Sequence, residues 1–476
     1  MPLELLLHHV RDSVCRSCSL LNSARRVAYG ILHPVSTHAV PDVGFAPPLI
    51  GAREIEEVVA TLQSGWLSTG PRVHQFERAF ADYVGAPHAI ALNSGTAALH
   101  LSLLAAGVGP GDDVVTTPLT FCSTANVIVQ VGATPRFADI DAATWNLCPA
   151  AAANAITPHT RALIPVHYAG RPVDVRAFRQ LANRHGAVLI EDAAHCVEGW
   201  SGGFKIGVTG DLTCFSFYAT KNLTTGEGGM LTTANDDWAA FARVASLHGM
   251  SRDAWTRYAT GGSPQYDVVM PGYKYNMMDL QAAIGLHQLA SLDEHWRRRD
   301  AIWRRYDEAL ADAPVTRPAP VAPGDRHARH LYTVLVDPVS GWSRDALMNA
   351  LRDEGIATSI HFRALHLHSY YAERFNLRRG MFPVAEMVSD RTLSLPLSAG
   401  MTDGDVDHVV SALERTLLRA RKTAQARPAT AAQGLSPATV VQDLTPAAVA
   451  QSFSPALRDV APISRPAIAD NSERRL

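Results

Sequence analysis

The segment SFYATKNLTTGEGGM, residues 216–230, places one lysine, Lys221, between an aromatic run and a glycine-rich run. The residues LTCFSFYA are typical of a buried strand, and GGMLTTA after the lysine predicts a turn that leads into a second strand. A lysine at the buried end of a sheet is costly, because its ammonium loses the water that solvates it. The segment therefore predicts a chemical role for Lys221.

Short apolar runs alternate with helical patterns on both sides of this segment. AIALNS precedes GTAALHLSLLAAG, DDVVTTP precedes a helix expected to begin near Phe121, and RALIPVHYAG precedes a helix expected at 173–185. AVLIEDA follows that helix. This alternation predicts an α/β protein with a large, mostly parallel sheet that is covered by helices on both faces.

The distribution of apolar and polar residues along the chain predicts two folded domains between two tails. We expect a large domain at 47–290 and a smaller α+β domain at 291–420, with a ligand cleft between them. The smaller domain is expected to contain HLYTVLVD, a helix at 343–354, ATSIHF, LSLPL and a last helix from Asp403, with long helices at 277–311 leading into it. Residues 1–46 and 421–476 are expected to be poorly ordered, because neither has a sustained apolar pattern.

Composition excludes some classes of partner. The formal net charge is −2, with 47% hydrophobic and 18% charged residues, so neither nucleic acid nor an anionic membrane is an expected partner. No apolar run reaches the length of a membrane span. Cys15 and Cys18 form a lone CRSC, a weak metal signal, so no metal is expected. The other cysteines are scattered through apolar segments and are expected to be reduced, which suggests the cytoplasm: Cys122, Cys148, Cys196 and Cys214.

Several polar and aromatic residues fall where strands are expected to end, the edge at which open parallel sheets bind ligands. Asp192 ends an apolar strand, and SGT (94–96) begins a helix whose N-terminus can hold a phosphate. Taken alone, SGT is more often a helix cap, Asp192 a structural carboxylate and Phe121 a core ring. Ser216 alone would be an ordinary strand serine, and His195 a buried histidine.

Together these residues supply the parts of a pyridoxal 5'-phosphate site. Burial lowers the pKa of a lysine, so that Lys221 offers a free amine that can form a Schiff base with the cofactor's aldehyde. A carboxylate such as Asp192 keeps the pyridine nitrogen protonated, and an aromatic ring stacks on the cofactor. We therefore predict that Lys221 carries this cofactor.

The motifs SGTAAL, TFCSTAN, DAAH, SFYATKNLTTGEGG and GYKYNMMDLQAAIG resemble the DegT/StrS family of nucleotide-sugar aminotransferases, over residues 49–418. The resemblance implies the type I pyridoxal phosphate (aspartate aminotransferase-like) fold and a homodimer with shared active sites. It implies Lys221 as the Schiff-base lysine, Asp192 as the partner of the pyridine nitrogen and Phe121 as the stacking ring. It further implies a contact near the phenolic oxygen (His195), phosphate contacts (Gly95, Thr96 and Ser216) and a contact to the neighbouring subunit's cofactor (Asn276).

IPVHYAG, GYKYN and YYAERF are most similar to the family members that make UDP-4-amino-4-deoxy-L-arabinose for lipid A modification. Other 4-keto-sugar aminotransferases of surface polysaccharide pathways share most of these motifs. The resemblance implies transfer of an amino group, in most of the family from glutamate, to a nucleotide-linked 4-keto-sugar. In IHFRALH, His361 and Arg363 are either ligands for substrate anions or a solvated basic strand end, and both interpretations stay open.

Three other functions remain to be distinguished. A sugar dehydratase on the same fold typically has histidine at the lysine position, which Lys221 does not match. A non-catalytic regulatory protein would need a DNA-binding or signalling module, and the tails show no helix-turn-helix pattern. A Rossmann oxidoreductase would need GxGxxG after the first strand, which is absent.

Overall fold

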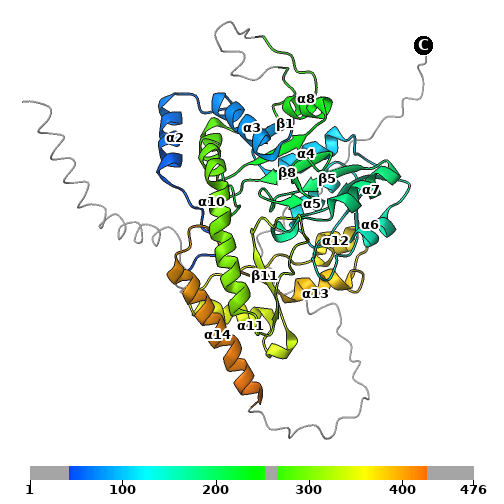
Figure 1. The fold of residues 1–476 in the computed structure, drawn as a ribbon. Coiled ribbons are helices and arrows are strands. Elements are labelled where there is room, and N and C mark those ends of the chain that lie inside the picture. Colours follow the sequence, from blue (N-terminus) through cyan, green and yellow to red (C-terminus); the bar gives the residue numbers. More distant parts are fainter. Residues whose placement is uncertain (1–41, 252–264, 426–476) are drawn as a thin grey trace, which may run out of the picture. The chain divides into compact units, whose positions relative to one another are not determined.

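The computed structural model describes residues 42–251 and 265–425 (Figure 1). Cys15 and Cys18 lie outside the described residues, as does most of each predicted tail. Within the described ranges, no helix is both long enough and apolar enough to cross a membrane.

Seven strands of the described chain form one main sheet, in the order β1-β9-β8-β5-β4-β2-β3. β9 is antiparallel to both of its neighbours, and the remaining pairings in this sheet are parallel. The predicted α/β class with a mostly parallel sheet is therefore confirmed. The strands are β1 (His88–Leu92), β2 (Asp113–Thr116), β3 (Thr134–Phe137), β4 (Thr160–Ile164), β5 (Val188–Asp192), β8 (Leu212–Ser216) and β9 (Gly229–Thr233).

Helices pack on both faces of this sheet (Figure 1). Successive side chains of β5 show the arrangement, because Leu189 belongs to one apolar core and Ile190 to the other. The first core includes residues of α3 (Pro71–Val84), α6 (Pro149–Ala155), α7 (Val175–His185) and α10 (Asp279–Ala309). The second core includes residues of α4 (Gly95–Ala105), α5 (Cys122–Gln130) and α8 (Asp236–Ala245).

Local sequence explains where the helices next to the main sheet begin and end. The Ser94 side chain caps α4 by accepting a hydrogen bond from the Ala97 amide at 3.1 Å, and Asp174 caps α7 in the same way. α7 ends at Gly186, which adopts the left-handed conformation that glycine tolerates. α2 (Ala52–Gln63) and a small hairpin, β6 (Trp200–Ser201) and β7 (Phe204–Lys205), complete this part of the fold.

A second, antiparallel sheet of three strands has its own apolar core within the described residues. ATSIHF (357–362) forms no regular strand there, although Ser359 makes one backbone bridge to Ser394 and the Thr392 hydroxyl donates to the His361 carbonyl at 3.1 Å. The elements are β10 (Val315–Thr316), β11 (Tyr332–Val336), β12 (Thr392–Leu395), α11 (Arg344–Asp353), α12 (Ser369–Arg374), α13 (Pro383–Arg391) and α14 (Asp403–Gln425).

The described structure departs from the predicted boundaries at three places. α10 is one helix of 31 residues and continues through the boundary expected at residue 290. α14 continues to Gln425, past the expected end of the folded region at 420. Ordered chain also begins before residue 47, because Val43 exchanges backbone hydrogen bonds with Gly355 and Ala357, at 3.1 and 3.0 Å. These pairings are between distant segments and leave no local periodicity in the sequence.

Candidate active site

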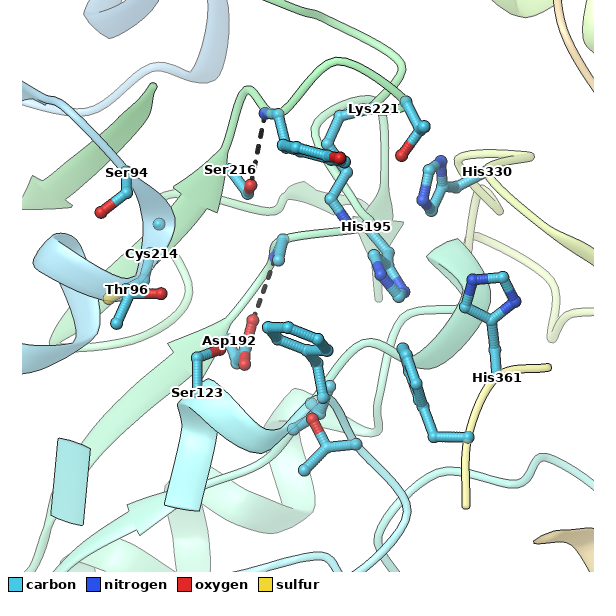
Figure 2. A pocket seen from close by; sticks show the side chains of 18 of the residues that line it. Ser94, Thr96, Ser123, Asp192, His195, Cys214, Ser216, Lys221, His330 and His361 are labelled. Atoms are coloured by element: carbon cyan, nitrogen blue, oxygen red, sulfur yellow. Dashed lines mark hydrogen bonds between the residues drawn. The ribbon is translucent and has the colours of Figure 1, made fainter. Parts of the chain in front are cut away.

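A pocket of about 640 Å³ lies at the carboxyl ends of the main-sheet strands (Figure 2). It is formed by the ends of β5 and β8, by the turns that lead into α4 and α5, by the residues just before β11 and by residues 360–362. Eight of the residues singled out in the sequence line it: Gly95, Thr96, Phe121, Asp192, His195, Ser216, Lys221 and His361.

Lys221 lies in the turn after β8, where its amide donates a hydrogen bond to the Tyr218 carbonyl at 2.9 Å. Its side chain is partly buried at the pocket wall. Burial lowers the pKa of the Lys221 ammonium to about 8, and the nearby negative charge of Asp192 acts in the opposite direction. About one Lys221 side chain in ten is therefore a free amine, the nucleophilic form, at pH 7, far more than for a lysine of ordinary pKa.

The pKa of Lys221 predicts how covalent capture of pyridoxal phosphate depends on pH. Only the free amine attacks an aldehyde, so the capture rate of cofactor-free protein should rise with pH and level off above about 8. The measurement is the growth of the visible absorbance of bound cofactor over a pH series, with Lys221→Ala as the blank. A rate that still rises with pH up to pH 10, as expected for a lysine with an ordinary pKa, would contradict the lowered pKa of Lys221.

Asp192 ends β5 and is held by two donors. The Thr124 hydroxyl donates to its Oδ2 at 2.8 Å, and the Ala194 amide donates to its Oδ1 at 3.2 Å. Burial raises the pKa of Asp192, while these hydrogen bonds and the positive charge of Lys221 oppose the rise. A carboxylate that is fixed and 4% exposed suits a cationic partner such as a protonated ring nitrogen.

The turn into α4 packs unusually close to β8 and β9. A Cβ on Gly95 would lie 2.9 Å from the Ser216 Cβ, and a Cβ on Gly229 would lie 2.4 Å from the Ser94 carbonyl carbon. Gly229 pairs directly with Ser216 across β8 and β9. The two glycines thus bring the first-turn amides of α4 beside the Ser216 side chain, an arrangement that suits a phosphate.

Replacing Gly229 by alanine should weaken binding of pyridoxal phosphate at least tenfold, because the added methyl group would push the Ser94–Gly95 backbone away from Ser216. The measurement is a fluorescence or absorbance titration of cofactor-free protein with pyridoxal phosphate. Gly404→Ala is the matched control, since its nearest neighbouring atom would lie 3.7 Å away. Wild-type affinity in a folded Gly229→Ala protein would contradict this role for the turn.

Two of the rings that line the pocket, those of Phe121 and His195, are available to a ligand. The Phe121 ring is 58% exposed although it lines the pocket, so its apolar face is open to a planar ligand. His195 is buried, and its Nδ1 has no hydrogen-bond partner among the residues that the structure describes. Burial lowers the pKa of His195 far below its usual value, and the positive charge of Lys221 adds to the effect. A neutral ring with an unpaired nitrogen is suited to hydrogen-bond a bound group.

Of three further residues predicted to bind ligands, only one lines the pocket. His361 lines the pocket, and burial with Lys221 lowers its pKa to about 3, so it can hydrogen-bond an anion but adds no positive charge. Arg363 is exposed, donates to the Leu367 carbonyl at 2.7 Å and does not line the pocket. Asn276 also lies outside it and donates to the Thr69 hydroxyl at 2.8 Å. Its reach into a neighbouring subunit stays a prediction.

Sequence reasoning missed pocket residues from the second sheet and the N-terminal flank. His330 precedes β11, Phe362 follows His361, and Phe45 stacks on the His361 ring at 5.6 Å. Phe362 lies within IHFRALH, where the polar residues on either side of it give the only ligand signal. His330 belongs to no motif that marks a ligand site, and Phe45 falls in the segment expected to be poorly ordered.

The described residues fit pyridoxal phosphate in each part of the pocket. Lys221 provides the amine and Asp192 the buried carboxylate. The α4 turn provides backbone amides that suit a phosphate, and Phe121 provides an open aromatic face. The unpaired Nδ1 of His195 remains for a polar group of the ligand.

Comparisons with known proteins agree with this geometry. The sequence profile described as "DegT/DnrJ/EryC1/StrS aminotransferase family" matches residues 48–414. The "Spore coat polysaccharide biosynthesis protein SpsC" of Bacillus subtilis (strain 168) is 52% identical over 371 residues, which cover 78% of this chain and 95% of SpsC.

Solved structures are similar over the same part of the chain. The PLP-form of Spr1654 from Streptococcus pneumoniae is 33% identical, with a TM-score of 0.74, and the match covers 79% of this chain and 99% of that one. Helicobacter pylori PseC, an "aminotransferase involved in the biosynthesis of pseudoaminic acid", is 26% identical, with a TM-score of 0.74 over 79% of this chain and 99% of PseC.

Proposed function

Because the chain belongs to the DegT/DnrJ/EryC1/StrS aminotransferase family of pyridoxal phosphate-dependent sugar aminotransferases, we propose that it transfers an amino group from glutamate to a nucleotide-linked 4-keto-sugar. The observation that carries the proposal is the meeting of Lys221 and Asp192 in one pocket, at the ends of adjacent strands. A lysine with a lowered pKa beside a fixed carboxylate is the pairing that this chemistry requires.

Each of the main side chains in the pocket has a separate role in the proposed reaction. Bound pyridoxal phosphate supplies an aldehyde and a ring that accepts an electron pair from the substrate carbon. Lys221 holds the cofactor and, once its amine is released, moves a proton at the carbon that bears the amine. Asp192 keeps the ring positively charged, and the α4 turn with Ser216 binds the phosphate.

The sugar is proposed to serve a surface polysaccharide, with lipid A modification as one such pathway. The names of SpsC and PseC support a role in carbohydrate biosynthesis and refer to different products. We place the reaction in the cytoplasm, since the described cysteines, Cys122, Cys148, Cys196 and Cys214, are free thiols.

The test of the proposal is an assay of the purified full-length protein with glutamate and a panel of UDP- and dTDP-linked 4-keto-sugars. Formation of an amino-sugar together with 2-oxoglutarate is the expected result. Loss of a sugar hydroxyl without amine transfer would favour the dehydratase. The absence of turnover and of a visible cofactor band that borohydride removes would favour the regulatory protein.

A homodimer with shared sites is also proposed, and it predicts complementation. A Lys221→Ala chain mixed with an inactive Asn276→Ala chain should recover part of the activity, because one site of each mixed dimer then has both residues intact. The measurement is turnover after subunit exchange, with each variant alone as the control. The absence of recovery, with exchange confirmed by mass, would count against a site shared through Asn276.

A further inference from the structure

A row of buried and partly buried polar side chains leads from α10 to the pocket. Arg299 of α10 is 4% exposed and forms an ion pair with Glu198, which is fully buried in the loop between β5 and β6. Asn222, which follows Lys221, donates from its Nδ2 to both carboxylate oxygens of Glu198, at 2.9 and 3.1 Å. The Nδ1 of His330 lies 3.0 Å from the Oδ1 of Asn222.

The acceptors around Asn222 fix the orientation of its amide. Its Nδ2 lies within hydrogen-bond distance of the Glu198 carboxylate and, at 2.8 Å, of the Ala328 carbonyl oxygen. A carboxylate paired with Arg299 and a backbone carbonyl can only accept, so both hydrogens of the amide nitrogen are used. The Asn222 oxygen must therefore face His330, and it can only accept a hydrogen bond from the histidine.

This orientation determines the tautomer of His330. Its Nδ1 carries the hydrogen, so its Nε2 is an unprotonated acceptor. His330 lines the pocket, and its Nε2 has no partner within the ranges that the structure describes (Figure 2). Burial and the positive charge of Lys221 keep the pKa of His330 far below its usual value, so the ring does not gain a second proton.

We propose that Arg299, Glu198 and Asn222 fix His330 as a hydrogen-bond acceptor, which selects a sugar that presents a hydroxyl group at this point of the pocket. The inference deepens the proposed function and rests on it for the identity of the substrate. A carboxylate of the amino donor is itself an acceptor and would be repelled by the Nε2 lone pair. A sugar hydroxyl can donate to it. Glu198 and Asn222 are positioning residues, and His330 is the group that contacts the substrate.

The tautomer can be measured without any substrate. The full-length protein with its cofactor is labelled with 15N-histidine, and the His330 signals are assigned by their loss in His330→Gln. The expected result is one protonated nitrogen, Nδ1, and one far-shifted unprotonated nitrogen, Nε2. In Asn222→Ala, the oxygen that accepts the hydrogen bond from Nδ1 is removed, while the ion pair of Glu198 with Arg299 stays. The His330 hydrogen is then no longer held at Nδ1 and should move to Nε2.

Glu386→Gln is the matched control, because Glu386 is a buried carboxylate that contacts another histidine, His366, at 2.9 Å and does not line the pocket. It should leave the His330 signals unchanged. Since an unfolded Asn222→Ala protein would give no ring signal to interpret, the wild-type spectrum is itself decisive. A protonated Nε2 in the wild-type protein would overturn the inference, as would a folded Asn222→Ala protein with an unchanged tautomer.

Kinetics then test the selection of the hydroxyl. Asn222→Ala should raise the KM for the keto-sugar roughly tenfold, the size of one hydrogen bond, and change the KM for glutamate less than about twofold. Equal changes in both KM values would overturn the selection of the sugar. If the protein aminates no keto-sugar at all, the proposed function fails. The imidazole signals still decide whether Asn222 and its partners fix the tautomer of His330.

Discussion

A Lys221→Ala protein should fold normally and lose amino-group transfer by roughly 10⁴-fold or more, since in the proposed reaction one amine both holds the cofactor and moves the proton. Binding of pyridoxal phosphate should persist in part, because Asp192, Phe121 and the α4 turn remain in the pocket. The measurements are turnover of glutamate with a keto-sugar, the visible absorbance of the protein and its thermal stability.

Lys205 provides a demanding control for Lys221. Burial lowers the pKa of Lys205 to about 8 as well, and its ammonium lies 3.0 Å from the centre of the Tyr83 ring, outside the pocket. Lys205→Ala should therefore retain turnover and borohydride-reducible absorbance, although the loss of the ring contact can lower stability. Lys221→Arg should fail like Lys221→Ala, because a guanidinium neither reacts with an aldehyde nor releases a proton near neutral pH. Wild-type turnover by Lys221→Ala would refute the aminotransferase assignment of this site.

An Asp192→Asn protein should bind cofactor but lose roughly 10²–10³-fold in rate, because a neutral amide does not hold the pyridine nitrogen in its charged form. The Thr124 hydroxyl that now donates to Oδ2 can also donate to the amide oxygen, so we expect only a small loss of stability. Single-turnover measurements with glutamate report the chemical step without the sugar, and a separate cofactor titration shows whether binding is retained.

Glu191 is the matched control for Asp192. It precedes Asp192 on β5 and therefore points to the opposite face of the sheet, where it accepts hydrogen bonds from Thr209 and Thr213, at 2.8 and 3.2 Å. Glu191→Gln removes a buried carboxylate without changing the pocket. Its rate should stay within a few-fold of wild type. If both variants lose rate equally, the effect belongs to the fold of the strand and not to the ring nitrogen.

The parts of the site that the sequence predicted are those set by a few consecutive residues. A strand that ends in Asp192, a turn that begins a helix at Gly95 and a lysine after β8 each leave a local pattern. The parallel sheet then brings them together, because its strands end at the same edge. The fold class followed from the same alternation of strands and helices.

The parts that the sequence did not predict depend on contacts between distant segments. His330 reaches the pocket because β11 belongs to a separate sheet, and its tautomer depends on the rotation of one amide, Asn222. Phe45 reaches it because Val43 pairs with the chain near Ile356. No periodicity or composition records such pairings, so they become visible only in three dimensions.

α10 has a consequence for how the protein unfolds. It is about 45 Å long, and it contributes Leu289 and Leu292 to one apolar core of the main sheet and Trp303 and Tyr306 to the core of the second sheet. If either core were lost, half of α10 would have no apolar packing. An unpacked helical segment of that length is at most marginally stable in water. The two cores should therefore unfold together, in a single transition with heat or denaturant, and the ligand site should be lost in the same transition.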